Sequence, residues 1–123
     1  MSGINLLLDT NIVLYLLSGD DTLESFLQGK KTYISIITEI ELLGYKTITN
    51  SEINKIKQFI EDCYVLPIDN SIKENTILIR RKYKKKLPDS IIIGTAIGND
   101  LPLISADSDF IGINELNLIH YEK

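Results

Sequence analysis

Short apolar runs alternate along the chain with longer stretches in which apolar residues recur every three or four positions. The short runs are rich in Leu, Ile and Val and end at polar residues, which is typical of buried strands. The longer stretches have the spacing of amphipathic helices, and several begin after a residue that can cap a helix. This pattern predicts strands at residues 4–8, 32–36, 64–68, 101–105 and 118–121.

Six helices are predicted between these strands. Ser51 is the expected N-cap of the fourth helix, and Pro88 is expected to interrupt the long fifth one. Strands that alternate with helices indicate a parallel sheet covered on both faces. We therefore expect an α/β fold with three layers, α/β/α, around a central, mainly parallel sheet of four to five strands. The helices are expected at residues 11–18, 22–28, 37–45, 51–63, from 69 or 70 to 86, and 89–98.

The chain of 123 residues shows no repeats and no Pro/Gly-rich linker, so we expect one domain over residues 1–123. A hydrophobic content of 44% supports a packed core and argues against disorder. No apolar run approaches the roughly 20 residues that a membrane span requires, and the N-terminal segment lacks the basic start of a signal peptide. The expected location is therefore the cytoplasm, without a membrane partner.

Cys63 and His120 are the only cysteine and the only histidine. An intramolecular disulfide and an ordinary zinc site are therefore excluded, and a bound metal would have to be held by oxygen atoms. A catalytic thiol would need a histidine as its base, so a pair of Cys63 with His120 is an alternative. Cys63 is more simply explained as a small, half-buried hydrophobic residue.

The net charge of −4 would ordinarily argue against a nucleic-acid partner, but the basic residues are concentrated in one basic strip. Six of the thirteen lie within residues 80–86, and on a continuous helix Arg80, Arg81 and Lys84 would share one face. Such a strip can simply be the solvated end of a helix. It also runs directly into Asp89, where its cations could contact the phosphates of RNA. The basic strip consists of Arg80, Arg81, Lys82, Lys84, Lys85 and Lys86.

Carboxylates follow or border several predicted elements. Asp9 and Asp107 each come just after a strand, and in a parallel sheet such positions share one edge, where ligands bind. Asp89 opens the sixth predicted helix. Taken singly, Asp9 and Asp89 are explained as helix N-caps, and Asp107 with Asp109 as a turn. Each could equally be a ligand of a cation.

Glu41 stands at helical spacing from Ile37 and Ile40, so it is expected to share or border the apolar face of its helix. Glu39 is rotated away from that face. An acid beside a buried stripe is costly unless it is paired or bound to a metal. The alternative is a surface glutamate whose carboxylate extends into water.

Four segments together resemble the PIN-domain ribonucleases, especially the VapC-type toxins of bacterial and archaeal type II toxin–antitoxin pairs. They are LLLDTNIVL (residues 6–14), SIITEIELLGY (35–45), LPDSIIIGTA (87–96) and LISADSDF (103–110). Their order and spacing extend over nearly the whole chain, and the combination is specific although DTN alone would be weak. The resemblance implies a PIN-like, Rossmann-like fold.

The same resemblance implies roles for particular residues. Asn11 and Ser105 correspond to polar residues beside the family's acids, and Ser105 keeps a hydroxyl where threonine is more common. Asp109 corresponds to an auxiliary acid. The implied activity is that of a Mg²⁺- or Mn²⁺-dependent endoribonuclease. The implied partners are RNA, a cognate antitoxin whose tail covers the acidic site, and a second copy of the chain in a homodimer. The family's catalytic, metal-binding acids correspond to Asp9, Glu41, Asp89 and Asp107.

The residue types agree with this chemistry. Four carboxylates without counter-charges would repel one another, and some would take up protons. Mg²⁺ and Mn²⁺ prefer oxygen ligands and would remove that conflict. One or two such ions would orient a water, lower its pKa and stabilise charge on the scissile phosphate, so no histidine is required.

Other classes of protein fit the sequence less well. A two-component receiver domain would need two acids after the first strand and a lysine after the fifth, where only the terminal Lys123 follows. A haloacid-dehalogenase-type phosphatase would need an aspartate at position 11, which is Asn11. Two alternatives to a toxin stay open: a noncatalytic PIN-like module that binds RNA or protein, and a housekeeping PIN nuclease of RNA processing.

Overall fold

The computed structural model describes residues 4–123, so the first three residues of the predicted domain 1–123 lie outside the described part. Five strands form one sheet in the order β3-β2-β1-β4-β5, and every neighbouring pair is parallel. The predicted α/β class and the mainly parallel sheet are thereby confirmed. The strands are β1 (Asn5–Leu8), β2 (Lys31–Ser35), β3 (Tyr64–Leu66), β4 (Leu103–Ser105) and β5 (Leu118–His120).

Within the described residues, α-helices connect β1 to β4 in turn, and a 3₁₀ turn lies between β4 and β5. None of the helices in residues 4–123 is long and apolar enough to cross a membrane. The α-helices are α1 (Thr10–Leu17), α2 (Asp21–Leu27), α3 (Ile36–Leu43), α4 (Asn50–Glu61), α5 (Asn70–Tyr83) and α6 (Leu87–Gly98), and a 3₁₀ turn, η1, spans Ser108–Phe110.

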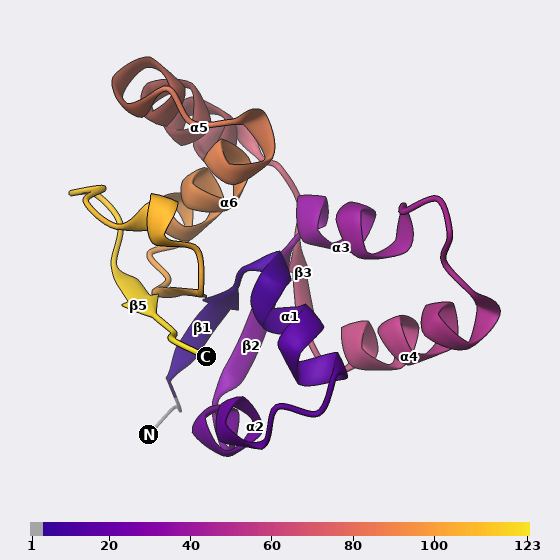
Figure 1. Cartoon of the computed structure of the whole chain (residues 1–123). Coiled ribbons are helices and arrows are strands. Elements are labelled where there is room, and N and C mark those ends of the chain that lie inside the picture. The colour runs from indigo at the N-terminus through magenta and orange to yellow at the C-terminus, as the bar shows by residue number, and fades with distance from the viewer. Residues whose placement is uncertain (1–3) are drawn as a thin grey trace.

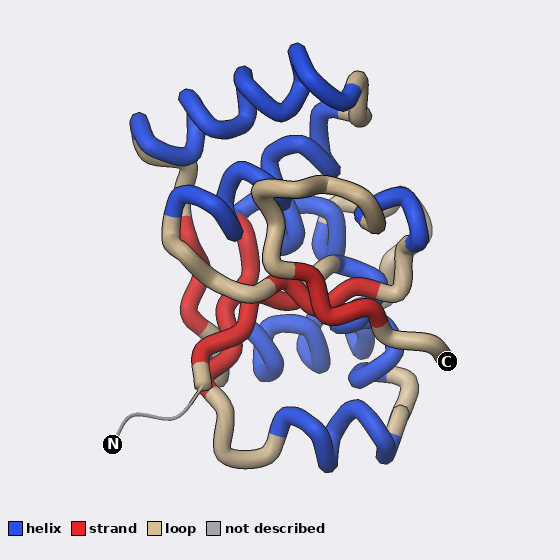
Figure 2. The backbone as a smooth tube through the Cα atoms, turned by 90° about the vertical axis from the view of Figure 1, so that its left-hand side faces the viewer, coloured by secondary structure: helices blue, strands red, loops and turns tan. Residues whose placement is uncertain are grey.

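The central strand carries apolar side chains to both faces of the sheet. Leu6 and Leu8 of β1 are completely buried in one cluster with residues of α1, α2 and α4. Leu7 lies in a second cluster with residues of α5 and α6. Figures 1 and 2 show these two groups of helices on opposite sides of the sheet. The alternation of side chains along β1 therefore requires three layers, because both faces must be covered.

The strand order brings the ends of two non-consecutive strands to one edge of the sheet. From β1 the chain moves to β2 and β3 on one side and later to β4 and β5 on the other. A parallel sheet opens beyond the carboxyl ends of its strands where the order reverses, which here is between β1 and β4. These strands pair through Leu7 with Leu103 and Leu8 with Ile104. Asp9 and the residues that follow Ser105 are thus brought to the same edge.

The start of α4 differs from the prediction. Its N-cap is Thr49 and not Ser51, because the Thr49 hydroxyl accepts a hydrogen bond of 3.1 Å from the Glu52 N–H. The Glu52 carboxylate in turn accepts from the Thr49 N–H at 3.0 Å. This reciprocal pair satisfies two N–H groups, which a single serine cap could not do.

The end of α5 also differs from the prediction. The helix ends at Tyr83 and does not continue to Lys86, because Lys84 has a left-handed backbone with a φ of 54°. The chain turns there and begins α6 at Leu87. Pro88 therefore interrupts no helix but lies in the first turn of α6, where an N–H has no helical partner to lose. The basic strip is split between a helix end and a connection.

Helices α5 and α6 approach each other closely at Gly94. A Cβ on Gly94 would overlap the Thr76 hydroxyl and lie 3.0 Å from the Ile72 carbonyl oxygen. Thr76 is buried and its hydroxyl donates to that carbonyl at 2.7 Å, so it is not free to move. We predict that Gly94→Ala lowers the free energy of unfolding by roughly 1–3 kcal/mol, the usual effect of overpacking. Urea denaturation measures the change.

Gly98→Ala on the same helix is the matched control. Its Cβ would lie 3.2 Å from side-chain atoms of Ile72 and Ser71, which can adjust. We expect a much smaller loss of stability than for Gly94→Ala. Equal losses in the two variants would contradict the close approach of the helices at Gly94.

Candidate active site

The four acids predicted from the sequence lie at the carboxyl edge of the sheet, each on a different element. Asp9 directly follows β1, and Asp107 follows β4 and begins η1. Asp89 lies in the first turn of α6, and Glu41 lies in α3. Asp9 feels the charges of Asp89 and Asp107, while Asp89 feels those of Asp107 and Glu41. The structure thus brings four carboxylates close enough to repel one another.

Asp9, Glu41, Asp89 and Asp107 are called the acid group below. Asp9 is its most buried member, with 6% of its surface exposed. It caps α1, and its carboxylate accepts hydrogen bonds from the Thr10 N–H at 2.8 Å and the Ser105 hydroxyl at 2.6 Å. Burial nevertheless raises the pKa of Asp9 to about 6, and the charges of Asp89 and Asp107 add to the effect. No lysine or arginine in residues 4–123 forms an ion pair with this carboxylate.

Ser105 and Asn11 hold the segment after β4 against the start of α1. The Ser105 hydroxyl donates to Asp9 and accepts from the Asp107 N–H at 3.0 Å. The side-chain oxygen of Asn11 accepts from the Ala106 N–H at 3.4 Å. These two polar residues therefore lie beside the acids and hold Asp9 close to Asp107.

Asp107 and Asp109 form the turn that their spacing indicated. The Asp107 carboxylate accepts from the Asp109 N–H at 2.9 Å as the N-cap of η1. Asp109 is exposed, and its charge acts on Asp89. The turn and the membership of Asp107 in the acid group are compatible, because only one carboxylate oxygen is used by the turn.

Glu41 reaches the acid group through Thr10, whose hydroxyl donates to the Glu41 carboxylate at 2.8 Å. Glu41 does border the buried face of α3, because Ile37 packs against the core, but the expectation that Ile40 lies on that face was wrong. Ile40 is 57% exposed, and α3 buries Thr38 and Leu42 in its place. The helix is apolar on several sides, so residue spacing alone could not show which side faces the core.

Thr10 and Thr38 were missed by reasoning from the sequence. Thr38 is completely buried, and its hydroxyl oxygen lies 3.0 Å from that of Thr10. A signal was present in the spacing, because Thr10 follows Asp9 and Thr38 precedes Glu41 by about one helical turn. Each threonine is thus adjacent, along the chain or along a helix, to one of the predicted acids.

Asp89 is partly buried and lies near Lys86. Burial is the main cause that raises the pKa of Asp89, followed by the charges of Asp107 and Glu41, whereas Lys86 lowers it. The interpretation of Asp89 as an N-cap was wrong, because Lys86 occupies that position and its side chain makes no capping hydrogen bond. The carboxylate of Asp89 is therefore not used to begin the helix.

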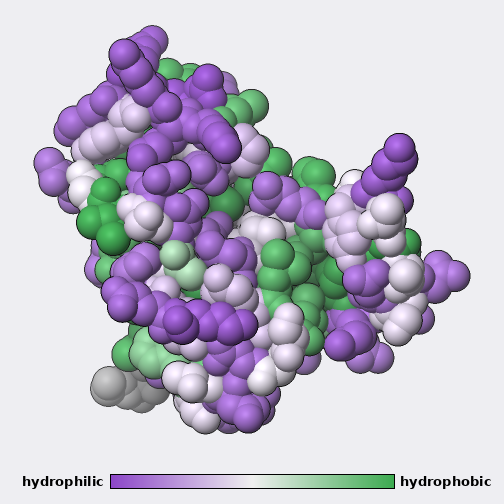
Figure 3. Space-filling view, viewed as in Figure 1, coloured by the Kyte–Doolittle hydropathy of each residue, from purple (hydrophilic) through white to green (hydrophobic). Residues whose placement is uncertain are grey.

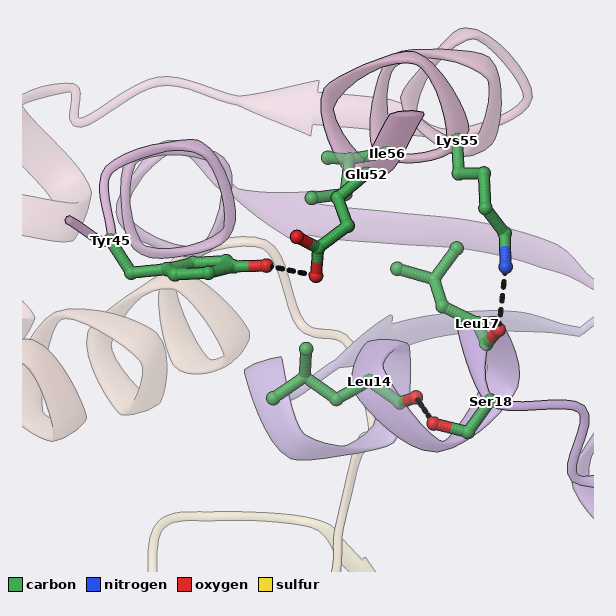
Figure 4. Close-up of a pocket in the computed structure, with 7 residues that line it drawn as sticks. All are labelled: Leu14, Leu17, Ser18, Tyr45, Glu52, Lys55 and Ile56. Atoms are coloured by element: carbon green, nitrogen blue, oxygen red, sulfur yellow. Dashed lines mark hydrogen bonds between the residues drawn. The ribbon is translucent and has the colours of Figure 1, made fainter. Parts of the chain in front are cut away.

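A cavity of about 200 Å³, lined by both apolar and polar side chains, lies apart from the acids, between α1, α4 and the segment after α3 (Figure 4). Figure 3 shows apolar side chains gathered at the surface there. Within the cavity, the Tyr45 hydroxyl donates to Glu52 at 2.5 Å. Leu14 and Leu17 line it from α1, the helix that begins next to Asp9. One helix therefore connects the cavity with the acid group.

A sequence profile of the PIN domain matches residues 6–116 of the chain. The chain belongs to the PIN-domain family. Among curated proteins, none matches the chain significantly. The resemblance inferred from the four sequence segments is confirmed.

Solved structures of toxin–antitoxin systems are similar to this PIN domain. A chain of a toxin–antitoxin complex from Klebsiella pneumoniae is 32% identical, with a TM-score of 0.81 over 96% of this chain and 99% of that one. VapBC2 from Rickettsia felis, bound to a DNA fragment from its promoter, contains a chain with 18% identity and a TM-score of 0.86, over 97% and 100%. VapBC-5 from Mycobacterium tuberculosis contains one with 20% identity and a TM-score of 0.69, over 95% and 98%. The last two show the shared fold alone.

The acids of this PIN domain fit a cation that prefers oxygen, although they do not form a closed set of ligands. Within residues 4–123, no three side chains of His, Cys, Asp or Glu are arranged to hold a metal ion. The charges that act on Asp9 come from the carboxylates of Asp89 and Asp107, and burial raises the pKa of Asp9. A divalent cation would relieve both the burial of this charge and the repulsion among its neighbours.

Two cations of the basic strip form contacts with the segment that follows β4. Lys82 forms an ion pair of 2.8 Å with Glu115, to which the Tyr83 hydroxyl also donates at 2.7 Å. The hydrogen bonds from Lys82 and Tyr83 lower the pKa of Glu115 to about 2. The Lys85 ammonium donates to the backbone oxygen of Asp109. These contacts fasten the segment after β4 to the end of α5.

The remaining cations do not share the expected helix face. Because α5 ends before Lys84, the prediction that Arg80, Arg81 and Lys84 lie on one face was wrong. The Arg80 guanidinium contacts a backbone oxygen of the connection at 3.4 Å. Burial raises the pKa of Asp89 overall, but the charge of Lys86 opposes this rise. Lys86 is thus a strip residue whose charge acts on the acid group.

The raised pKa of Asp9 makes the stability of the metal-free protein depend on pH. Burial holds the pKa at about 6 in the folded state, against 3.8 for an ordinary aspartate. The folded state therefore binds this proton more tightly than the unfolded state does. The contribution of this proton to the free energy of unfolding is fully present below the lower of these values and is lost as the pH rises from about 4 to about 6.

We predict that Asp9→Asn stabilises the metal-free protein at pH 7 by up to roughly 3 kcal/mol, the equivalent of about two pKa units. Asparagine can keep both contacts, since its oxygen accepts from Thr10 and its NH₂ donates to Ser105, whose hydroxyl can rotate. Urea unfolding in EDTA measures the difference at pH 7 and at pH 4, where it should nearly vanish. A variant no more stable than the wild type at pH 7 would disprove the prediction.

Proposed function

We propose that the protein is a Mg²⁺- or Mn²⁺-dependent endoribonuclease that hydrolyses RNA phosphodiester bonds, and that it is the toxin of a toxin–antitoxin pair. The observation that carries this proposal is the acid group at the carboxyl edge of the sheet, in which Asp9 is buried without an ion pair in residues 4–123. Membership of the PIN-domain family supports it. The proposal treats residues 1–123 as one domain.

In this proposal the acid group holds the ion and the surrounding residues keep the acids in place. An ion held there would lower the pKa of the attacking water and offset negative charge at the scissile phosphate. Ser105 orients the Asp9 carboxylate, and Ser105 and Asn11 together hold the segment that carries Asp107. Asp109 adds negative charge beside the site. The residues that would hold the ion are Asp9, Glu41, Asp89 and Asp107.

The basic strip would contribute to RNA binding. Lysine and arginine contacts to phosphates supply affinity and position the strand without reading its sequence. Lys86 is the first candidate, because its charge acts on Asp89 within the proposed site. Lys84 and Lys85 lie on the same connection between α5 and α6. Arg80 and Arg81 would extend the positive surface along the end of α5, while the charge of Lys82 is partly offset by its ion pair with Glu115.

We also propose a cognate antitoxin as a partner of this chain. The relative from Klebsiella pneumoniae, 32% identical, was solved in a toxin–antitoxin complex. Leu14 is 45% exposed on α1, the helix that begins next to Asp9, and lines the cavity; exposed apolar side chains favour protein contacts. An antitoxin tail that lies along α1 would cover the acids and block the site.

A second copy of the chain is the other proposed protein partner. Ile77 of α5 and Leu87 at the start of α6 are 39% and 54% exposed and line the same apolar surface pocket. Large apolar side chains at the surface are typical of interfaces when they form a continuous patch. A homodimer would cover these side chains.

The test of the proposed function is RNA cleavage by the purified chain. We expect cleavage with Mg²⁺ or Mn²⁺, loss of cleavage with EDTA, and recovery when excess metal is added. Asp9→Asn and Glu41→Gln remove a charge but keep the shape of the side chain. Each should lower the cleavage rate by more than about 100-fold. Residues that only orient the ligands of a metal change activity by up to about 100-fold, and loss of a ligand should have a larger effect.

Asp62→Asn is the matched control, because this exposed aspartate at the end of α4 lies outside the acid group. It should cleave like the wild type. Full activity after exhaustive chelation would rule out the metal mechanism. A wild-type chain that binds an antitoxin but cleaves no RNA would instead favour the noncatalytic module.

The assignment of Lys86 can be tested by the salt dependence of RNA binding. We predict that Lys86→Ala weakens binding and flattens the slope of log affinity against log salt by about 0.7, the value for one phosphate contact to a single strand. The measurement uses the noncleaving Asp9→Asn protein. Lys57→Ala, an equal change of charge at an exposed position on α4, is the control. Identical slopes for the two variants would show that Lys86 contacts no phosphate.

A further inference from the structure

Thr10 contacts two of the four acids at once. Its N–H donates to one oxygen of Asp9, and its hydroxyl donates to one oxygen of Glu41, both at 2.8 Å. The two acids come from separate parts of the chain, since Asp9 follows β1 and Glu41 lies in α3. Thr10 is therefore a bridge between two carboxylates of the proposed site.

A second hydroxyl, that of Thr38, donates a hydrogen bond to the hydroxyl of Thr10. Thr38 is completely buried, and its Oγ1 lies 3.0 Å from the Oγ1 of Thr10. A hydroxyl donates one proton, and an ionised carboxylate can only accept. Because Thr10 donates to Glu41, Thr38 donates to Thr10. The hydrogen bonds thus run in one direction from a buried residue to an exposed acid, and each polarises the next.

Glu41 needs such support because it is exposed on α3. Among the described residues, its carboxylate forms a hydrogen bond with Thr10 alone. A glutamate side chain has many rotamers in water, and ordering it opposes binding. A ligand that is already held in one rotamer loses less freedom when an ion binds.

We propose that Thr10 and Thr38 form a hydroxyl relay that positions the Glu41 carboxylate for binding of a divalent cation. The relay rests on the proposed function, and it adds two positioning residues to the site. In this relay neither hydroxyl binds the ion or the RNA. Each acts only by orienting the Glu41 carboxylate. Residues that orient the ligands of a metal typically change its affinity by about 10- to 100-fold.

The test measures Mn²⁺ binding by calorimetry to the full, metal-stripped chain. Thr10→Val removes the hydroxyl but keeps the branched shape of the side chain, and should raise the Kd for Mn²⁺ by roughly 10- to 100-fold. Thr38→Val should raise it less, because Glu41 keeps its direct bond to Thr10. Thr10→Ser keeps the hydroxyl and should stay within about threefold of the wild type.

A double-mutant cycle separates the relay from a general structural role. If Thr10 acts through Glu41, Thr10→Val should have a much smaller effect on the Mn²⁺ affinity of Glu41→Gln than on that of the wild type. Thr47→Val is the control, because it makes the same chemical change at an exposed position between α3 and α4. It should bind Mn²⁺ like the wild type.

Three results would overturn the relay while leaving the proposed function in place. They are wild-type Mn²⁺ affinity in Thr10→Val, equal losses in Thr10→Ser and Thr10→Val, and additive losses in the cycle with Glu41→Gln. In each case the wild-type chain would still bind Mn²⁺ and cleave RNA. A wild-type chain that does neither would overturn both the relay and the proposed function.

Discussion

The burial of one carboxylate among other carboxylates is the constraint on which the rest of the site depends. Burial at the end of β1 removes the Asp9 carboxylate from water, which costs free energy. Hydrogen bonds from Ser105 and Thr10 offset only part of this desolvation cost. Burial outweighs them, since it holds the pKa of Asp9 at about 6. The charges of Asp89 and Asp107 then act on the same group. An arrangement of this kind favours a bound cation, because a cation offsets burial and repulsion together.

The packing of the fold prevents these charges from moving apart. The Asp9 N–H donates to the Ile104 carbonyl at 3.0 Å, so the first acid is fixed to the strand that leads to Asp107. Asp89 is held from the other layer, because α6 packs against α5 at Gly94 with no room for a Cβ. Separating the acids would therefore require changes in both the sheet and a helix contact.

Much of the fold and part of the site could be predicted from the sequence. Alternating apolar runs indicated the strands, and acids at the ends of β1 and β4 share an edge in any parallel sheet with these neighbours. The end of α5 could not be predicted, because lysine favours helices. The left-handed backbone of Lys84 is set by the turn that leads the chain into α6, which the local sequence does not show. Thr10 and Thr38 were missed because the direction of a hydroxyl depends on contacts that exist only in the folded chain.

The turn at Lys84 explains how an acidic protein can offer positive charge beside an acidic site. On a continued helix, the cations of the basic strip would have pointed in several directions. Because the chain turns, Lys85 reaches the backbone of the segment after β4, and Lys86 begins the helix that carries Asp89. Charges are screened beyond about 8–10 Å at physiological salt, so a phosphate responds to these neighbours more than to the net charge of −4. On the proposed function, an ion held by the acids would also weaken their repulsion of RNA. Ion and RNA would then each favour binding of the other.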